Sequence, residues 1–545
     1  MIIHKFEISG NIVDVVKQRI FKGTVVVENG KIITIREENV SETQYILPGL
    51  IDAHVHIESS MIIPSEFARL AVVHGTVATV SDPHEIGNVL GMKGVKFMIE
   101  NGKKVPFKFY FGAPSCVPAT PFETSGASIG VDEIEELMSN PEIKYLSEMM
   151  NFPGVLFKDK DVMQKLAIAS KYNKPVDGHA PGLKGEDANK YVVAGISTDH
   201  ECFTIDEAID KINSGMLIQI REGSAAKNFE ALIGLLTTHP DSVMFCSDDK
   251  HPNDLVNGHI NQLVKRAIGK GYNPFAVLRA CTFIPVKHYN LEVGLLQLND
   301  AADIIVVDNL QNFNVKSTFI NGVKVAEDGQ SYIESVNETT PNIFKAKEIT
   351  VEDIKVINKT SSIKVIKALE GELITKFLTI KPKIVNNIIH SDIENDILKI
   401  VVMNRYQPGA KPAVAFINGF QLKKGAMAST VAHDSHNIIA VGTNDIDIVN
   451  AINLLIKSTG GISLVNENET YHLPLAVAGL MSADNGFEVA EKYDFIDKKA
   501  KEFGSVLNAP YMTMSFMALL VIPELKLSDK GLFDGNKFEF TALEI

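Results

Sequence analysis

The chain of 545 residues contains no tryptophan and only four cysteines. The absence of tryptophan decides nothing, but the cysteines are informative because they are widely scattered and form no Cys-x-x-Cys pair. This usage favours a reducing cytoplasm over a disulfide-bonded secreted protein. We expect packing roles rather than catalysis for all four, which are Cys116, Cys202, Cys246 and Cys281.

Long apolar runs and an excess of positive charge are also missing. No stretch of about 18 apolar residues occurs, which argues against a membrane-spanning helix. Residues 1–7 lack the apolar core and cleavage site of a signal peptide. The net charge of -14, from 53 basic and 67 acidic residues, argues against a nucleic-acid partner, because phosphate binding needs a basic surface. We therefore expect a cytoplasmic protein with neither nucleic acid nor membrane as partner.

Short strands lie on both sides of a long middle segment. Residues 1–48 contain an Asn-Gly pair at 29–30, which predicts a hairpin because both turn positions require a positive φ. The same pattern returns at 321–322. We therefore expect residues 1–48 and 291–335 to pair into one small composite β-domain.

The middle segment, residues 49–290, alternates short apolar strands with helical stretches, which predicts a parallel sheet. About 240 residues is the span of a (β/α)8 barrel, whose active sites gather at the carboxyl ends of the strands. Residues 336–545 are expected to form an additional C-terminal α+β domain. We predict another Asn-Gly hairpin there at 418–419 and an amphipathic helix across 445–458. The predicted fold class is thus α/β, a barrel with two added domains.

The first predicted barrel strand ends in His54-Val55-His56. Alternate residues of a strand point the same way, so the two imidazoles can converge on one metal ion. Taken alone, a His-x-His pair is more often two surface or hydrogen-bonded histidines. Here four further ligand-type residues follow, each at the end of a later predicted strand: Glu148, His179, His200 and Asp248.

These six residues predict a metal-dependent barrel. Four imidazoles and two carboxylates can hold two divalent ions, with one carboxylate bridging them. The mixture suits zinc, iron or manganese rather than calcium or magnesium. A single strand-end acid is usually a helix cap or a solvated loop residue, but six such residues in one barrel are not expected by chance. Asp249 is the alternative to Asp248, because the sequence does not decide which carboxylate faces inward.

The order His-x-His, acid, His, His, Asp resembles the amidohydrolase superfamily. Many binuclear members of that superfamily bridge their metals with a carboxylated lysine on the fourth barrel strand, whereas this chain has Glu148 there. Further stretches resemble the adenine deaminase family, including that family's own C-terminal domain: 81–88, 147–155, 177–182, 199–201, 246–252, 404–406, 417–420 and 431–437. The resemblance covers nearly the whole chain.

This resemblance implies hydrolysis of adenine to hypoxanthine and ammonia by a metal-bridging hydroxide in a binuclear site. It implies two divalent transition-metal ions, with Mn2+ or Fe2+ preferred and Zn2+ as the alternative. C6 of adenine is a poor electrophile, so the reaction needs a hydroxide near neutral pH and a proton on ring N1. Asp248 is expected to accept the proton of the hydroxide and to pass it to the departing amine. Glu148 is expected to bridge the metals, and it or a neighbouring acid such as Glu85 to protonate N1.

Residues near the barrel mouth are candidates for contacts with the purine base. His84 and Glu85 end the second predicted strand, where they would meet the purine edge or move protons. The alternative is a helix start at Asp82 with both side chains in solvent. Glu222 would accept from a ring N–H, or else form a structural pair with Arg221.

The C-terminal region contains a second group of chemically able side chains, His433, Asp434 and His436. Spaced i and i+3, the two histidines could share a helix face and reach over the barrel mouth as a lid. Alternatively, they satisfy the polar groups of a turn. We also expect a homo-oligomer, because barrels with an appended β-domain often associate.

Two other functions remain as alternatives. The same metals would serve another amidohydrolase reaction, such as hydrolysis of a cyclic amide or an N-acyl amino acid. Glu148 in place of a bridging lysine and the C-terminal region favour the deaminase. A metal-free barrel kept as a scaffold would predict loss of the ligands, yet all six are present.

Overall fold

Strands from both sides of the barrel segment form one eight-stranded sheet in the computed structural model, which describes residues 5–545. In spatial order they are β17 (Gln330–Ser331), β16 (Val323–Glu327), β15 (Val315–Ile320), β14 (Ile304–Val307), β4 (Tyr45–Pro48), β1 (Lys5–Asp14), β2 (Arg19–Glu28) and β3 (Lys31–Glu37). β4 joins the two halves, because it pairs parallel with β1 and antiparallel with β14. The exact boundaries of the composite domain stay a prediction.

The two Asn-Gly turns predicted in this sheet are present. The turn at 29–30 connects β2 to β3, and the turn at 321–322 connects β15 to β16. All four turn residues have φ between 48° and 78°. This is the left-handed backbone that Asn and Gly adopt most readily, so the two hairpins follow from local turn chemistry.

Eight parallel strands close into a barrel within residues 50–249. They are β5 (Leu50–His56), β6 (Thr76–Ser81), β7 (Lys108–Ala113), β8 (Ile143–Met149), β9 (Val176–Gly178), β10 (Thr198–Asp199), β11 (Leu217–Arg221), and β12 (Val243–Cys246) with β13 (Asp248–Asp249) as the eighth. A bridge from Val176 to Ile196 joins the fifth strand to the sixth, and β13 pairs with β5. The predicted (β/α)8 barrel is confirmed.

Helices surround the barrel and bury their apolar faces against it. They are α1 (Pro64–Val72), α2 (His84–Leu90), α3 (Met92–Gly102), α4 (Val131–Ser139), α5 (Phe152–Leu156), α6 (Lys160–Lys171), α7 (Gly185–Val193), α8 (Ile205–Asn213), α9 (Phe229–Leu232), α10 (Leu235–Thr238), α11 (Pro252–Asn257), α12 (Ile260–Gly269), α13 (Pro274–Ala280) and α14 (Phe283–Tyr289). In α12, for example, Ile260, Leu263, Val264 and Ala267 are buried, which is the i, i+3, i+4, i+7 spacing of one helix face.

The C-terminal region contains a second eight-stranded sheet. In spatial order its strands are β19 (Lys376–Ile380), β18 (Ile363–Lys367), β23 (Ala413–Asn418), β22 (Leu398–Met403), β25 (Ile438–Gly442), β24 (Ala426–Ser429), β26 (Gly461–Val465) and β27 (Thr470–Pro474). The remaining elements are the 3-10 helix η3 (Val351–Ile354), the hairpin β20 (Lys383–Val385) and β21 (Ile388–His390), helices α15 (Asp445–Ser458), α16 (Gly486–Glu502) and α17 (Pro510–Phe516), and the small sheet β28 (Leu525–Ser528), β29 (Gly531–Asp534) and β30 (Glu539–Phe540). The amphipathic helix predicted across 445–458 is confirmed as α15, which begins where Asn444 Oδ1 accepts a hydrogen bond from Asp447 N at 2.9 Å.

The hairpin predicted at 418–419 is wrong. β23 is already paired on both sides, with β22 and with β18, so no edge is open for a returning strand. Instead, Asp396 Oδ2 accepts a hydrogen bond from Gly419 N at 2.7 Å and holds the chain as it leaves β23. The chain then crosses to β24, on the other side of β25.

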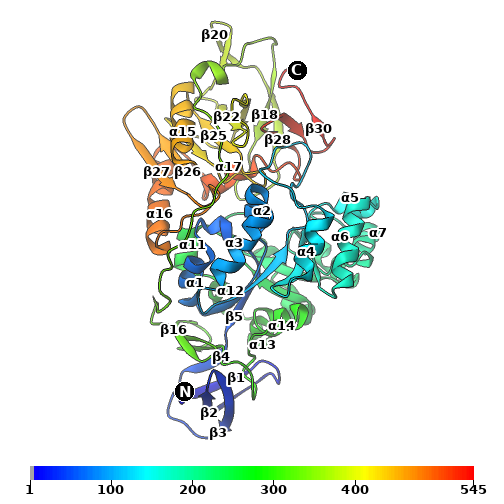
Figure 1. The fold of residues 1–545 in the computed structure, drawn as a ribbon, viewed down its shortest axis with the longest axis vertical. Coiled ribbons are helices and arrows are strands. Elements are labelled where there is room, and N and C mark those ends of the chain that lie inside the picture. The colour runs from blue at the N-terminus through cyan, green and yellow to red at the C-terminus, as the bar shows by residue number, and fades with distance from the viewer. Residues whose placement is uncertain (1–4) are drawn as a thin grey trace.

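Figure 1 shows the composite sheet at one end of the molecule, the barrel in the middle and the C-terminal region at the other end. The C-terminal region contacts loops that follow the barrel strands. Asn437 donates to Thr124 O at 2.9 Å, and Tyr493 on α16 lies 2.5 Å from His251 Nδ1. The carboxyl ends of the strands therefore face this region. Among the residues that the structure describes, none belongs to a helix long and apolar enough to span a bilayer.

Candidate active site

The six predicted metal ligands all meet at the carboxyl ends of the barrel strands, and all are buried. The carboxylate of Glu148 on β8 lies between two groups of histidines. Its Oε1 is 3.4 Å from His56 Nε2, while its Oε2 is 2.7 Å from His179 Nδ1 and 3.2 Å from His200 Nε2. One carboxylate oxygen on each side is the arrangement that a bridging ligand requires.

Asp248, rather than Asp249, faces the first pair of histidines. Asp248 Oδ1 lies 3.2 Å from His56 Nε2 and 3.8 Å from His54 Nε2, and the two Nε2 atoms are 3.2 Å apart. Asp249 instead accepts a hydrogen bond from Ser59 Oγ at 2.5 Å. Asp248 therefore faces the histidine pair and Asp249 does not, a choice that the sequence left open.

The donor set around His56 fits a divalent metal ion. His56 Nδ1 is 3.2 Å from the carbonyl oxygen of Asp82, which can only accept, so Nδ1 carries the proton and Nε2 a lone pair. That lone pair faces oxygens of Asp248 and Glu148, which are also acceptors. Three acceptors directed at one another in a buried site need a cation between them. Imidazole and carboxylate ligands suit a divalent transition metal.

Histidines and one arginine keep the central carboxylates ionised. Burial alone would raise the pKa of Glu148 and of Asp248. The neighbouring His179 and His200 hold the pKa of Glu148 well below its ordinary value. For Asp248, Arg221 has the same effect, and Arg221 Nη1 donates to Asp248 Oδ2 at 2.6 Å.

Arg221 also donates to Glu201, at 2.9 Å from Nη2 to Oε2. Glu201 Oε1 lies 3.6 Å from His179 Nδ1 and 3.5 Å from His200 Nε2, so this buried acid belongs to the cluster. The place of Glu201 in this cluster was not predicted from the sequence. The available signal was its position directly after His200, at the end of a predicted strand.

Asp52 fixes the first strand against the eighth. Its Oδ1 accepts from Ser247 N at 3.0 Å and from His54 N at 3.3 Å, and its Oδ2 lies 2.8 Å from His259 Nε2. Asp52 precedes His54 by two residues on the same face of β5, so these contacts hold the strand that presents the histidine pair.

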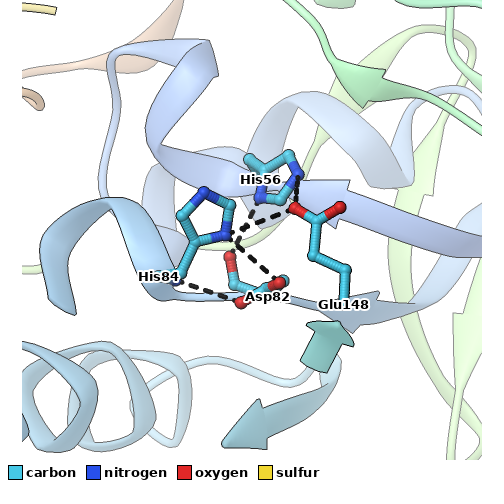
Figure 2. Close-up of side chains that lie close together, drawn as sticks. All are labelled: His56, Asp82, His84 and Glu148. Atoms are coloured by element: carbon cyan, nitrogen blue, oxygen red, sulfur yellow. Dashed lines mark hydrogen bonds and ion pairs between the residues drawn. The ribbon is translucent and has the colours of Figure 1, made fainter. Parts of the chain in front are cut away.

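His84, from the end of the second strand, faces the same cluster (Figure 2). Its Nδ1 lies 3.2 Å from Asp82 Oδ2 and 3.5 Å from Glu148 Oε1, and its side chain points toward His56 and Glu148. Asp82 Oδ1 also accepts from His84 N at 3.1 Å, so the helix start considered for this segment is present. However, both His84 and Glu85 are buried rather than solvated.

Glu85 connects the barrel to the C-terminal region. His433 Nδ1 lies 2.6 Å from Glu85 Oε1, and His436 Nε2 contacts Glu85 Oε2. Burial would raise the pKa of Glu85, but His433 and His436 hold it well below its ordinary value. The two histidines lie in a turn between β24 and β25 rather than on a helix, and Asp434 Oδ1 is 3.8 Å from His84 Nε2.

Glu222 is not brought into the cluster. Its Oε1 accepts from Nη1 of Arg266, a residue of α12, at 2.7 Å. This ion pair gives no support to a contact between Glu222 and the substrate. It also differs from the Glu222–Arg221 pair considered as the alternative, because Arg221 turns inward to Asp248.

Two family models together match most of the chain. The amidohydrolase family model matches residues 45–325, and the model described as the adenine deaminase C-terminal domain matches residues 372–539. The chain is 55% identical over 535 residues to the adenine deaminase of Sulfurovum sp. (strain NBC37-1), a match that covers 98% of this chain and 99% of the relative. The chain belongs to the adenine deaminase family. It is also 52% identical to the adenine deaminase of Methanosarcina mazei and 50% identical to that of Salinibacter ruber, each over 98% of both chains.

Family membership and geometry agree on a metal centre. The amidohydrolase family implies a divalent metal ion, and several groups of buried histidines and acids in the described residues can hold one. The turn that carries His433 and His436 lies inside the part matched by the adenine deaminase C-terminal model. That turn is therefore part of the family's own domain, and it reaches the barrel cluster through Glu85.

Proposed function

We propose that the protein hydrolyses adenine to hypoxanthine and ammonia. The observation that carries this proposal is the 55% identity to a relative named adenine deaminase, which extends over 98% of the chain and so includes both the barrel and the C-terminal region. The buried cluster supports the proposal, because its residues suit hydrolysis at a carbon that bears an amine.

We propose two divalent ions in this cluster, with Glu148 between them. The histidine pair and Asp248 would hold one ion, and His179 and His200 the other. Bound there, the ions would lower the pKa of water and supply hydroxide near neutral pH. Mn2+ or Fe2+ is proposed before Zn2+, and metal analysis of the purified protein decides among them.

Asp248 is proposed as the base that takes the proton of the attacking water. Its Oδ2 accepts from Arg221, so its Oδ1 is the oxygen left to receive a proton. As the C6–O bond forms and the C6–N bond breaks, Asp248 passes this proton to the departing amine. The leaving group is then ammonia, since an unprotonated amide ion is a very poor leaving group.

A second proton reaches ring N1 when water adds to C6. Glu85, whose carboxylate is ionised at rest, is proposed to take the second proton of the attacking water and deliver it to N1, with His84 beside it at 3.5 Å between Nε2 and Oε1. Glu148 is the alternative carrier of this proton, because its Oε1 lies 3.5 Å from His84 Nδ1. One water is consumed and one ammonia is released for each hypoxanthine formed.

Location and assembly are also proposals. The scattered cysteines are all buried and free among the described residues, which supports a cytoplasmic protein. A homo-oligomer is proposed by analogy with other barrels that carry an added β-domain, and light scattering after size-exclusion chromatography tests it.

The activity is tested by adding adenine to protein reconstituted with Mn2+, Fe2+ or Zn2+ and measuring ammonia and hypoxanthine. The same protein should leave a cyclic amide and an N-acyl amino acid unchanged. Absence of ammonia from adenine at every metal loading would refute the proposal, and hydrolysis of either other substrate would favour a different amidohydrolase reaction.

A further inference from the structure

Glu85 receives one histidine contact on each of its carboxylate oxygens, and both histidines come from the C-terminal domain. Glu85 lies on α2 at the end of the second barrel strand, and His433 is 348 residues later in the chain. The Nδ1 atom of His433 is 2.6 Å from Oε1, and Nε2 of His436 contacts Oε2. Contacts on both oxygens restrict the plane of the carboxylate as well as its position.

The tautomer of His436 follows from its other ring nitrogen. Ala432 N donates to His436 Nδ1 at 3.3 Å, so Nδ1 is an acceptor and the ring proton lies on Nε2. Nε2 is also the nitrogen that contacts Glu85 Oε2. Burial lowers the pKa of His436, in agreement with a neutral ring.

His433 carries a positive charge that faces the negative charge of the Glu85 carboxylate. Burial would lower its pKa, but Glu85 and Asp249 more than offset this and raise the pKa of His433 to about 9. Its ring stacks on Phe516 of α17, with centroids 5.0 Å apart and planes at 26°. A cationic ring held against an aromatic side chain has little freedom to turn away from Glu85.

The turn that carries the two histidines is itself anchored. His436 N donates to Ala432 O at 2.7 Å, and Tyr406 Oη donates to Ser435 O at 2.6 Å. Asn437 Nδ2 donates to Thr124 O in the loop after the third barrel strand at 2.9 Å. These bonds tie the turn to its own domain and to the barrel, so the histidines are presented to Glu85 in one orientation.

We propose that His433 and His436 are positioning residues for the deamination, which hold the Glu85 carboxylate in the orientation it needs to exchange a proton with the purine. The inference rests on the proposed function. It assigns to the C-terminal domain a direct share in the catalytic geometry of the barrel. A lid would need only to cover the mouth, whereas a histidine contact on each oxygen of one carboxylate aligns a reacting group.

In the matched variants, His433 and His436 are each replaced either by alanine or by an amide residue. The amide residue keeps an N–H donor that can face Glu85. His433→Asn keeps an N–H near the place of Nδ1, and His436→Gln keeps one near Nε2. We expect each alanine variant to lose about 100-fold in kcat with a much smaller change in KM, since positioned proton transfer contributes roughly 100-fold to 10,000-fold. The amide variants should recover to within about tenfold of the parent.

His472→Ala, on β27 of the same domain, is the control and should behave as the parent enzyme. Metal content and melting temperature are measured for every variant. Parent-like kcat in both alanine variants would overturn the inference, and so would equal losses in the alanine and amide variants. An inactive parent enzyme would instead refute the proposed function, so the two failures are distinct.

A second measurement does not depend on turnover. In full-length protein loaded with Zn2+ and labelled with 13C at histidine Cε1, the His433 signal is assigned from its absence in His433→Asn. Pairing with Glu85 predicts that the pKa of His433 falls in Glu85→Gln. An unchanged titration of that signal would show that the contact does not exist in solution and would overturn the inference.

Discussion

At the scale of single residues, one arginine balances the charge of two buried carboxylates in the site. Asp248 and Glu201 are buried carboxylates, and Arg221 donates to both of them. The guanidinium therefore ties the proposed base to a second acid that faces the histidines of the cluster. Loss of any member leaves an uncompensated charge in a buried site.

Replacing Asp248 by Asn should remove the proposed base with little change in shape. We expect kcat to fall about 100-fold to 10,000-fold, the range of general acid–base catalysis. Ammonia release from adenine measures the effect, and metal analysis shows whether the ions are still bound. A variant that keeps both its metal and its full rate would exclude Asp248 as the base.

Replacing Arg221 by Gln should change the pH profile. Arg221 lowers the pKa of Asp248, so its loss raises that pKa. The base must be ionised to accept a proton, and the acid limb of kcat/KM should therefore move to higher pH. Arg221→Lys keeps a positive charge and is expected to move the limb less. Identical acid limbs in the two variants would contradict this role.

The six metal-cluster residues were predictable because they lie at the ends of five predicted strands and have ligand chemistry, which are local properties of the sequence. The contacts of Arg221 with Asp248 and Glu201 were not, since they join three different strand ends of the barrel. The contacts of Glu85 depend on packing between segments 348 residues apart. Neither segment contains a sequence pattern that predicts this contact.

At the scale of elements, turn chemistry predicted two hairpins and failed at a third. The Asn-Gly pairs at 29–30 and 321–322 form hairpins because each connects strands whose partners are adjacent in sequence. The pair at 418–419 follows a strand with two partners already, β22 and β18, so tertiary pairing decides the path. The barrel itself was predictable from alternating strands and helices.

The two confirmed turns pack against each other, which makes Gly30 sensitive to substitution. A Cβ at Gly30, where φ is +78°, would lie 2.6 Å from Asn321 O. Gly329 has a similar φ of +80° but open space around it. We expect Gly329→Ala to cost about 1 kcal/mol from backbone strain alone. Gly30→Ala should cost roughly 1–2 kcal/mol more, as measured by urea unfolding, because the two turns must separate.

At the scale of the whole molecule, the C-terminal region and the barrel enclose the site together. The cluster residues are buried, and α16 and the turn of His433 contact loops that follow the barrel strands. Bound metal should therefore stabilise the assembly of both parts and not the barrel alone.

Removal of metal by a chelator should lower the melting temperature. Without cations, the lone pairs and carboxylates of the cluster face one another in a buried site. A ligand that binds only the folded state adds about 4 kcal/mol when its free concentration is about 1,000 times Kd. Calorimetry before and after addition of Mn2+ or Zn2+ measures this, with Glu148→Gln as a variant expected to show a smaller shift.

The composite sheet has a consequence for how the chain is made. β4 cannot complete its pairing until β14 has been synthesised, and at about 5–20 residues per second the roughly 260 residues between them take about 10–50 seconds. During that interval the edge of an apolar strand, with Ile46 and Leu47, stays open to other chains. We therefore expect the nascent protein to be prone to aggregation until β14 has been made, and a fragment that ends before residue 304 to remain so.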